Sequence, residues 1–343
     1  MKKYLIPQEG KFFKANLHCH STVSDGKLTP EEIKEMYRKM GYSVVAFTDH
    51  DVMIPHADLN DEEFLALNGY ELEVCEDDDG DFPNVKYFHI CLIALEPDNL
   101  KQVCWHRQKY LIGNGINYRD QVQFYENEVD YERKYTLECL NDIIKRGRDR
   151  GFFVTYNHPS WSMEDYEQYI RYENLSAMEI TNTICELDGY EGYSGQMYDD
   201  MLRAGKRLYC TGTDDNHNKV GRENRNSKRW DSGGNWVMIK ADNLDYRTIT
   251  KAMEDGNFYS SQGPEIHELW IEEGKVHIKT SAVERIALIT GNRRSLFKIA
   301  EDRDGIFEAC FDLCPDSNYF RIKVTDYYGK CANTNAYFMD EVL

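Results

Sequence analysis

The feature that most constrains the fold is a regular alternation of short apolar, β-rich segments with helical segments, from about residue 12 to residue 262. The first helix is the clearest and is predicted over 31–40. Thr29 and Glu32 have the spacing of a capping box, and Pro30 suits the first helical turn. Repeated β-then-α units of this kind predict an α/β protein with a largely parallel sheet or barrel.

Further strand-like segments follow along the chain, and helical patterns separate several of them. Strands are predicted at 43–50, 87–95, 152–158, 176–182, 207–215 and 235–240, and helices near 133–149, 195–204 and 244–255. The segment 100–132 interrupts this pattern because it is long, polar and rich in tyrosine. We expect it to be an insertion near the mouth of a site.

After residue 262 the pattern changes to alternating strands with turn residues such as Glu273-Gly274 and Asp304-Gly305 between them. Such a succession of short strands predicts a small all-β sandwich. We therefore predict two domains, a first one over 1–262 and a C-terminal β-sandwich over 263–343.

Composition restricts the functions that the chain can have. The net charge of −19 argues against stable binding to nucleic acid and against anionic membranes, since both depend on Lys and Arg neutralising phosphates. The N-terminus has only a short apolar stretch at 4–6, and no segment approaches a membrane span. The ten cysteines include no CxxC pair, which favours free thiols in a reducing compartment. We expect a cytoplasmic protein.

Side chains that can bind metals begin with His18 and His20. They are separated by one residue on a predicted strand, so both imidazoles point to the same face. Asp25 follows closely, and His50 comes at the end of the next strand. Taken alone, the pair could also be two structural histidines, but its neighbours favour a metal site.

The later candidates also lie near strand ends, where βα barrels keep their active sites. His and carboxylate ligands without Cys suit Mn, Fe or Zn in a hydrolytic site. The complete set of candidate ligands is His18, His20, Asp25, His50, Glu71, His89, His158, Asp215 and His217.

In this order the motifs resemble the PHP (polymerase and histidinol phosphatase) superfamily. They are HCHSTVSDG (18–26), TDHD (48–51), GYE (69–71), the isolated His89, NHPSW (157–161) and GTDDNH (212–217). The resemblance implies a distorted (βα)7 TIM-like barrel that holds two or three divalent metals. One metal would take His18, His20 and Asp215. Glu71 would bridge to a second metal bound by His89 and His158, and a third would take Asp25, His50 and His217.

Three positions in this assignment have alternatives or departures. Glu73 lies on the same strand face as Glu71 and could substitute for it, and Asp214 is the neighbour of Asp215. Asp25 stands where many relatives with three metals carry His. This change keeps a ligand but favours a harder metal.

The resulting functional hypothesis is a metal-dependent phosphoesterase. It would cleave small phosphate mono- or diesters, such as nucleotides or short oligonucleotides, with a metal-bound hydroxide held by Glu71 and Asp215. The substrate would be a small phosphorylated compound. Two alternatives are a carbamate or carboxyl ester hydrolase using the same centre, and a non-catalytic binding protein in which the sandwich recognises a partner.

Substrate contacts are predicted in the basic segment 218–230, which follows His217. Arg222 and Arg225 could clamp a phosphate there, with Lys219 alongside, or the segment could be a solvated surface loop. Asn182 could face the cavity or simply form a turn. Tyrosines of the insertion could stack on a base or sugar, although core packing or a lid is the favoured role.

Overall fold

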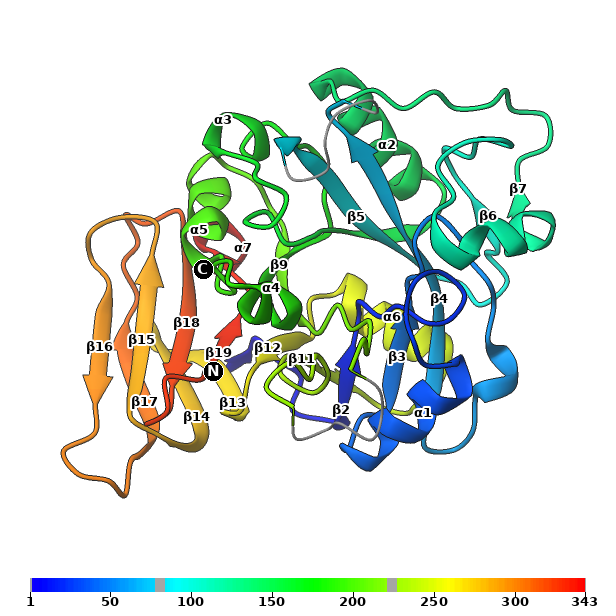
Figure 1. The fold of residues 1–343 in the computed structure, drawn as a ribbon. Helices are drawn as coiled ribbons and strands as arrows, with labels where there is room; N and C mark the ends of the chain where they lie inside the picture. The colour runs from blue at the N-terminus through cyan, green and yellow to red at the C-terminus, as the bar shows by residue number, and fades with distance from the viewer. Residues whose placement is uncertain (1, 78–83, 221–226, 343) are drawn as a thin grey trace.

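The computed structural model describes residues 2–77, 84–220 and 227–342, and a single large sheet runs through most of the molecule (Figure 1). One half of this sheet holds seven neighbouring strands. Their order is β10 (Tyr209–Thr213), β9 (Ala177–Asn182), β8 (Phe152–Tyr156), β5 (Tyr87–Ala94), β4 (Leu65–Cys75), β3 (Val44–Phe47) and β2 (Lys11–Asn16).

The parallel arrangement expected for these strands is interrupted at β5. The pairs β2–β3, β3–β4, β8–β9 and β9–β10 are parallel, whereas β5 is antiparallel to both β4 and β8. The start of β5 therefore lies at the same end of the sheet as the carboxyl ends of its neighbours. This reversal brings His89, the third residue of β5, to the end where the other candidate ligands lie.

The segments after β2 and β10 approach each other closely. Cys19 and Asn216 form an isolated parallel bridge, the amide of His20 donates to the carbonyl of Asn216 at 3.1 Å, and the amide of Asp215 donates to the carbonyl of His18 at 3.0 Å. The two outer strands of this half thus meet beside the candidate ligands. The α/β class predicted from the sequence is confirmed, while the closed seven-stranded barrel stays a prediction.

Helices cover this half of the sheet, and the first follows its sequence signals. In α1 (Pro30–Lys39), the Thr29 hydroxyl accepts from the amide of Glu32, and the Glu32 carboxylate accepts from the amide of Thr29. The other helices are α2 (Leu137–Asp149), α3 (Tyr166–Tyr169), α4 (Thr183–Asp188), α5 (Gly195–Arg203) and α6 (Tyr246–Glu254). No helix of the described residues is long and apolar enough to cross a membrane.

The large sheet continues beyond β2 into the C-terminal region without a break in strand pairing. The continuing strands are β11 (Trp236–Ala241), β12 (Phe258–Ser261), β19 (Cys331–Thr334), β18 (Tyr319–Thr325), β15 (Arg285–Thr290) and β16 (Leu296–Ile299), with β20 (Tyr337–Phe338) beside β18 and the short helix α7 (Met339–Val342) after it.

A second sheet, in the order β1 (Lys3–Tyr4), β13 (Ile266–Glu272), β14 (Lys275–Val283) and β17 (Ile306–Asp312), belongs to the same C-terminal region. Ile278 of this sheet and Leu288 and Ile322 of the large sheet share one buried core, which is consistent with the predicted sandwich. Strand β1 comes from the N-terminus and pairs with β13. The division into 1–262 and 263–343 stays a prediction.

The segment predicted as an insertion contains the short strands β6 (Lys101–Gln102) and β7 (Gln123–Phe124) and a 3-10 helix over Gly113–Gln121. The amide of Asn114 donates to the carbonyl of Ser24 at 2.8 Å. The segment therefore packs against the loop that follows the His18 and His20 pair, close to the candidate site.

Candidate metal centre

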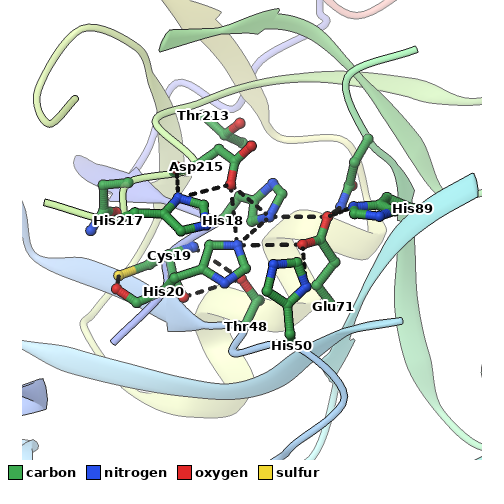
Figure 2. Close-up of polar contacts among 12 residues, drawn as sticks. His18, Cys19, His20, Thr48, His50, Glu71, His89, Thr213, Asp215 and His217 are labelled. Carbon is green, nitrogen blue, oxygen red and sulfur yellow. Dashed lines mark hydrogen bonds and ion pairs between the residues drawn. The ribbon is translucent and has the colours of Figure 1, made fainter. Parts of the chain in front are cut away.

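His18 and His20 lie just after β2 and point into the same space, as the alternation of the strand predicts (Figure 2). Their Nε2 atoms are 3.1 Å apart, and both rings are fully buried. Cys19, between them, packs instead among buried apolar side chains. The following loop is held by Asp49, whose carboxylate accepts from the backbone amides of Ser21 and Ser24.

Glu71, on β4, is the centre of the cluster. Its Oε1 lies 3.2 Å from His18 Nε2, 3.1 Å from His89 Nδ1 and 3.2 Å from His158 Nε2. Its Oε2 lies 3.3 Å from His20 Nε2 and 3.2 Å from His50 Nδ1. One carboxylate thus faces separate groups of imidazoles with its two oxygens, which is the geometry that a bridging ligand requires.

Asp215 closes the group on the opposite side. Its Oδ1 lies 3.1 Å from His20 Nε2 and 3.3 Å from His18 Nε2, and its backbone has a φ of 54°, in the left-handed region. This uncommon conformation for a non-glycine residue turns the carboxylate toward the histidines. Such outliers are concentrated at functional sites.

The predicted third set also comes together. His217 Nε2 lies 3.3 Å from Asp25 Oδ2, and Asp25 Oδ1 lies 3.8 Å from His20 Nδ1 and 4.0 Å from His50 Nε2. The side chain of Asp25 is 32% exposed, whereas Glu71 and Asp215 are buried. Asp25 therefore lies on the solvent side of the cluster.

The two alternatives from the sequence occupy different places. Glu73 contacts His89 Nε2 at 2.9 Å and lies farther toward solvent than Glu71. Asp214 faces away from the histidines, where it accepts hydrogen bonds from Tyr37, Thr183 and the amides of residues 233–235. Glu71 and Asp215 are thus the members of each pair that face the imidazoles.

The electrostatics of the cluster are those of tightly paired acids and bases. Burial alone would lower the pKa of His20, but hydrogen bonds to Asp215 and Glu71 outweigh it and raise that pKa to about 10. The pKa of His89 is likewise raised to about 10, against burial, by Glu71. Burial and the nearby charge of His20 lower the pKa of His50 to about 4. Without metals, protons on the imidazoles balance the carboxylates.

Residues of this kind in this arrangement fit divalent metals. Three groupings of atoms within 4.8 Å of one another correspond to the predicted sets, namely His18–His20–Glu71–Asp215, Glu71–His89–His158 and His20–Asp25–His50–His217. The Nδ1 atom of His20 is buried and makes no hydrogen bond to the described residues, and the buried Nδ1 atom of His50 has only its 3.2 Å ion-pair contact with Glu71. A buried polar atom without a hydrogen bond is costly, and a bound cation would satisfy such a ring nitrogen. The number and identity of the metals stay predictions.

Sequence reasoning missed Glu179, which lies on β9 behind His18. Its Oε1 is 2.7 Å from His18 Nδ1 and accepts from the Thr213 hydroxyl, while Oε2 accepts from the amide of His158 at 2.9 Å. Holding Nδ1 in this way leaves the Nε2 of His18 facing Glu71 and Asp215. A glutamate within the apolar strand AMEITN was the available signal.

Arg133 is a second buried charge that the sequence analysis did not single out. Its Nη2 lies 2.6 Å from Asp51 Oδ1, and its Nη1 donates to the carbonyl of Glu73 at 2.8 Å. The amide of Asp51 in turn donates to the carbonyl of Glu71 at 2.7 Å. Arg133 thus joins the end of the insertion to the turn that carries His50.

The predicted substrate contacts have mixed outcomes. Arg222 and Arg225 lie outside the described residues, while Lys219 lines the cavity above the cluster. Asn182 caps α4, and its amide nitrogen lies 2.9 Å from Glu179 Oε2 and 3.3 Å from Asp215 Oδ2. Contact of Asn182 with a substrate stays a prediction.

A cavity of about 210 Å³ opens over the cluster. Besides candidate ligands and Glu73, it is lined by Ile112, Trp161, Ile184, Asp188 and Lys219. The tyrosines of the insertion (Tyr110, Tyr118, Tyr125 and Tyr131) are not among its lining residues. Tyr110 lies under the Arg133 guanidinium and Tyr131 donates to Asp142, so these two have packing roles.

The fold and the site define an α/β protein with a buried cluster of His, Asp and Glu that could hold metal ions. The sequence profile of the PHP domain matches residues 16–202, more than half of the chain. The chain belongs to the PHP domain family. The match confirms the family and the class of protein, a hydrolase, predicted from the motifs.

The individual proteins that resemble this chain do so over a short segment or at low sequence identity. A 60-residue segment is 42% identical to a 5'-3' exoribonuclease of Haemophilus influenzae, and it spans 17% of this chain and 21% of that protein's length. A two-domain protein from Bacteroides vulgatus, which contains a predicted PHP-like metal-dependent phosphoesterase, is 13% identical with a TM-score of 0.45 over 95% of this chain and 94% of its own. A candidate metal-dependent phosphoesterase from Bifidobacterium adolescentis is 18% identical with a TM-score of 0.38 over 63% and 91%.

Proposed function

We propose that this protein is a metal-dependent phosphoesterase that hydrolyses small phosphate mono- or diesters, such as nucleotides or short oligonucleotides. The observation that carries the proposal is the convergence of six imidazoles and two further carboxylates, Asp25 and Asp215, around Glu71 beneath an open cavity. Divalent metals bound there would lower the pKa of water and neutralise charge on phosphoryl oxygens.

The residues of the chain have distinct tasks in this proposal. Glu71 and Asp215 hold the reacting centre from opposite sides, and Glu179 keeps the His18 ring in the orientation that faces it. Lys219 stands at the rim, where an ammonium group can attract the substrate anion. Arg222 and Arg225 are proposed to add to this attraction.

The finer features of the family are part of the same proposal. We propose that the seven strands from β2 to β10 form the distorted barrel, which the bridge between Cys19 and Asn216 supports. Mn, Fe or Zn are the proposed metals, and Asp25 favours a hard ion in the third set. We also propose a cytoplasmic location and no stable binding to nucleic acid, both on the basis of the composition of the chain.

A panel of esters tests the reaction class. Protein loaded with Mn²⁺ should hydrolyse 4-nitrophenyl phosphate or nucleoside monophosphates and release inorganic phosphate. Matched 4-nitrophenyl esters of acetic acid and of a carbamic acid test the alternative, because they share the same leaving group. Turnover confined to the acetate or carbamate would overturn the proposal.

A further inference from the structure

The cavity above the metal cluster has an apolar side as well as an ionic floor. Trp161, Ile112 and Ile184 line it together with His89, His158 and other candidate ligands. They come from three separate segments, namely the loop after β8, the insertion and α4. A hydrophilic sugar phosphate alone would leave these surfaces in contact with water, whereas ligand pockets of this type usually cover an apolar part of the ligand.

Trp161 is held in a defined orientation. Its ring centroid lies 5.2 Å from that of His89, 5.2 Å from that of His158 and 5.7 Å from that of Tyr87. The two histidines belong to the Glu71–His89–His158 grouping. A phosphate bound at that grouping would therefore lie close to the indole.

The size of the cavity limits what can be attached to the phosphate. A volume of about 210 Å³ is below the range of about 300–1,000 Å³ typical of pockets for drug-sized ligands. It suits one ring beside a phosphate, with larger parts of a substrate extending through the opening. Aromatic side chains hold planar rings well because both present flat faces of large area.

We propose that Trp161, with Ile112 and Ile184, forms an apolar wall that selects phosphate esters carrying a planar aromatic ring close to the scissile phosphate. The inference rests on the proposed phosphoesterase activity and adds its substrate class. Trp161 is the specificity-determining residue of the wall. Two kinds of ester carry such a ring, namely aryl or arylmethyl phosphates and nucleoside phosphates.

Two matched pairs of substrates separate these sources. Benzyl phosphate and cyclohexylmethyl phosphate differ in planarity but have similar size and leaving group, and adenosine 5'-monophosphate differs from ribose 5-phosphate only by its base. For the Mn²⁺-loaded protein, kcat/KM should favour the aromatic member of at least one pair by about tenfold, the size expected of one stacked ring. The pair that shows the preference identifies the source.

Variants of Trp161 connect the preference to the wall. Trp161→Leu should reduce the ratio to near one, whereas Trp161→Phe should retain most of it. Metal content is measured for each variant, because Trp161 touches two candidate ligands. Tyr166→Ala removes a 52%-exposed aromatic ring outside the cavity and should keep the wild-type ratio. An equal ratio in wild type and Trp161→Leu would overturn the inference.

Calorimetric binding of the same four compounds separates this inference from the proposed function. If no ester is cleaved but the aromatic members still bind about tenfold more tightly, and only with Trp161 or Phe present, the wall is supported and the phosphoesterase proposal fails. If all four esters are cleaved without preference, the phosphoesterase proposal holds and the wall is wrong.

Discussion

Two buried regions of the molecule use charge in opposite ways. In the metal centre, five imidazoles approach the single carboxylate of Glu71, and the buried Nδ1 atom of His20 makes no hydrogen bond in the described chain. In the C-terminal region the core is formed mainly by Ile, Val and Leu, with Phe, Ala, Tyr and Met among them. Its large buried charge, Arg321 on β18, makes two 2.8 Å contacts with Asp199 of α5.

This difference in how charges are paired distinguishes a site that can bind ions from a contact that stabilises the fold. A bidentate pair such as Arg321 and Asp199 satisfies its own charges, and it ties the two-sheet region to the helical half of the molecule. The metal centre concentrates ring nitrogens and carboxylates that satisfy one another only partly, which favours the entry of cations. Changes to the Arg321–Asp199 pair should alter stability, and changes in the metal centre should alter chemistry.

The largest expected effect is at the metal centre. His20→Ala removes the imidazole that faces Glu71 and Asp215, and Asp215→Ala removes the carboxylate that faces His18 and His20. In either variant metal content should fall and hydrolysis should drop by about a thousandfold or more. Circular dichroism should show a folded chain. Metal analysis and phosphate release measure the two effects.

The matched control for this prediction is His267→Ala. His267 lies on β13, its side chain is 49% exposed, and it is far from the cluster in the strand order. It should keep metal content and turnover. Chelation of the wild-type protein should abolish turnover and added metal should restore it, whereas full activity of Asp215→Ala after the same treatment would show that the ligand assignment is wrong.

Breaking the buried ion pair between Arg321 and Asp199 should have the next largest effect. Arg321→Met leaves Asp199 buried without its cation, which should lower the free energy of unfolding by about 3–5 kcal/mol. The double variant with Asp199→Leu should recover part of this loss, because no charge then remains unpaired. Urea denaturation measures stability, and kcat per folded molecule should stay unchanged. A loss of bound metal in folded Arg321→Met would show that the two regions are coupled.

Local signals in the sequence predicted many of the helices, strands and candidate ligands of the metal centre. The capping box at Thr29, the alternation of His18 and His20, and the strands that carry or precede most of the remaining candidate ligands all depend on neighbouring residues. The reversal of β5 was missed, although a signal was present. Residues 76–86 are too few for the crossover of a dozen or more residues that a parallel return requires.

Contacts between distant segments could not be predicted in the same way. Glu179 meets His18 across 161 positions of sequence, and the contact depends on the order of strands in the sheet. Arg321 and Asp199 meet across 122 positions because the large sheet continues into the C-terminal region. Neither glutamate nor arginine carries a local motif that indicates its partner.

Glu179 supports the metal centre from behind, so its loss should have a smaller effect than the loss of a ligand. Glu179→Gln offers an NH2 group where two donors, the His158 amide and Asn182, now meet a carboxylate oxygen. We expect metal affinity to fall about 10- to 100-fold, as for other carboxylates that orient metal-binding histidines. Competition with a chelator measures this affinity, and excess Mn²⁺ should restore turnover. Glu173→Gln, at a surface ion pair with Lys206, is the control; equal affinities in both variants would remove Glu179 from the positioning role.

The pH dependence of metal binding tests the same centre without any substitution. The pKa values of His20 and His89 are raised to about 10 in the metal-free protein, so both imidazoles carry protons at neutral pH. A ligating imidazole must be neutral, and each bound metal therefore displaces protons. Affinity should rise by about tenfold per pH unit for each proton released between pH 6 and 8. Calorimetry in two buffers of different ionisation enthalpy counts these protons.

The unfolding free energy contributed by Arg321 should not change across the same window, since its guanidinium pKa is raised further above an already high value. Metal binding without proton release would mean that these imidazoles are not ligands, and the contrast between the two buried regions would then need a different explanation.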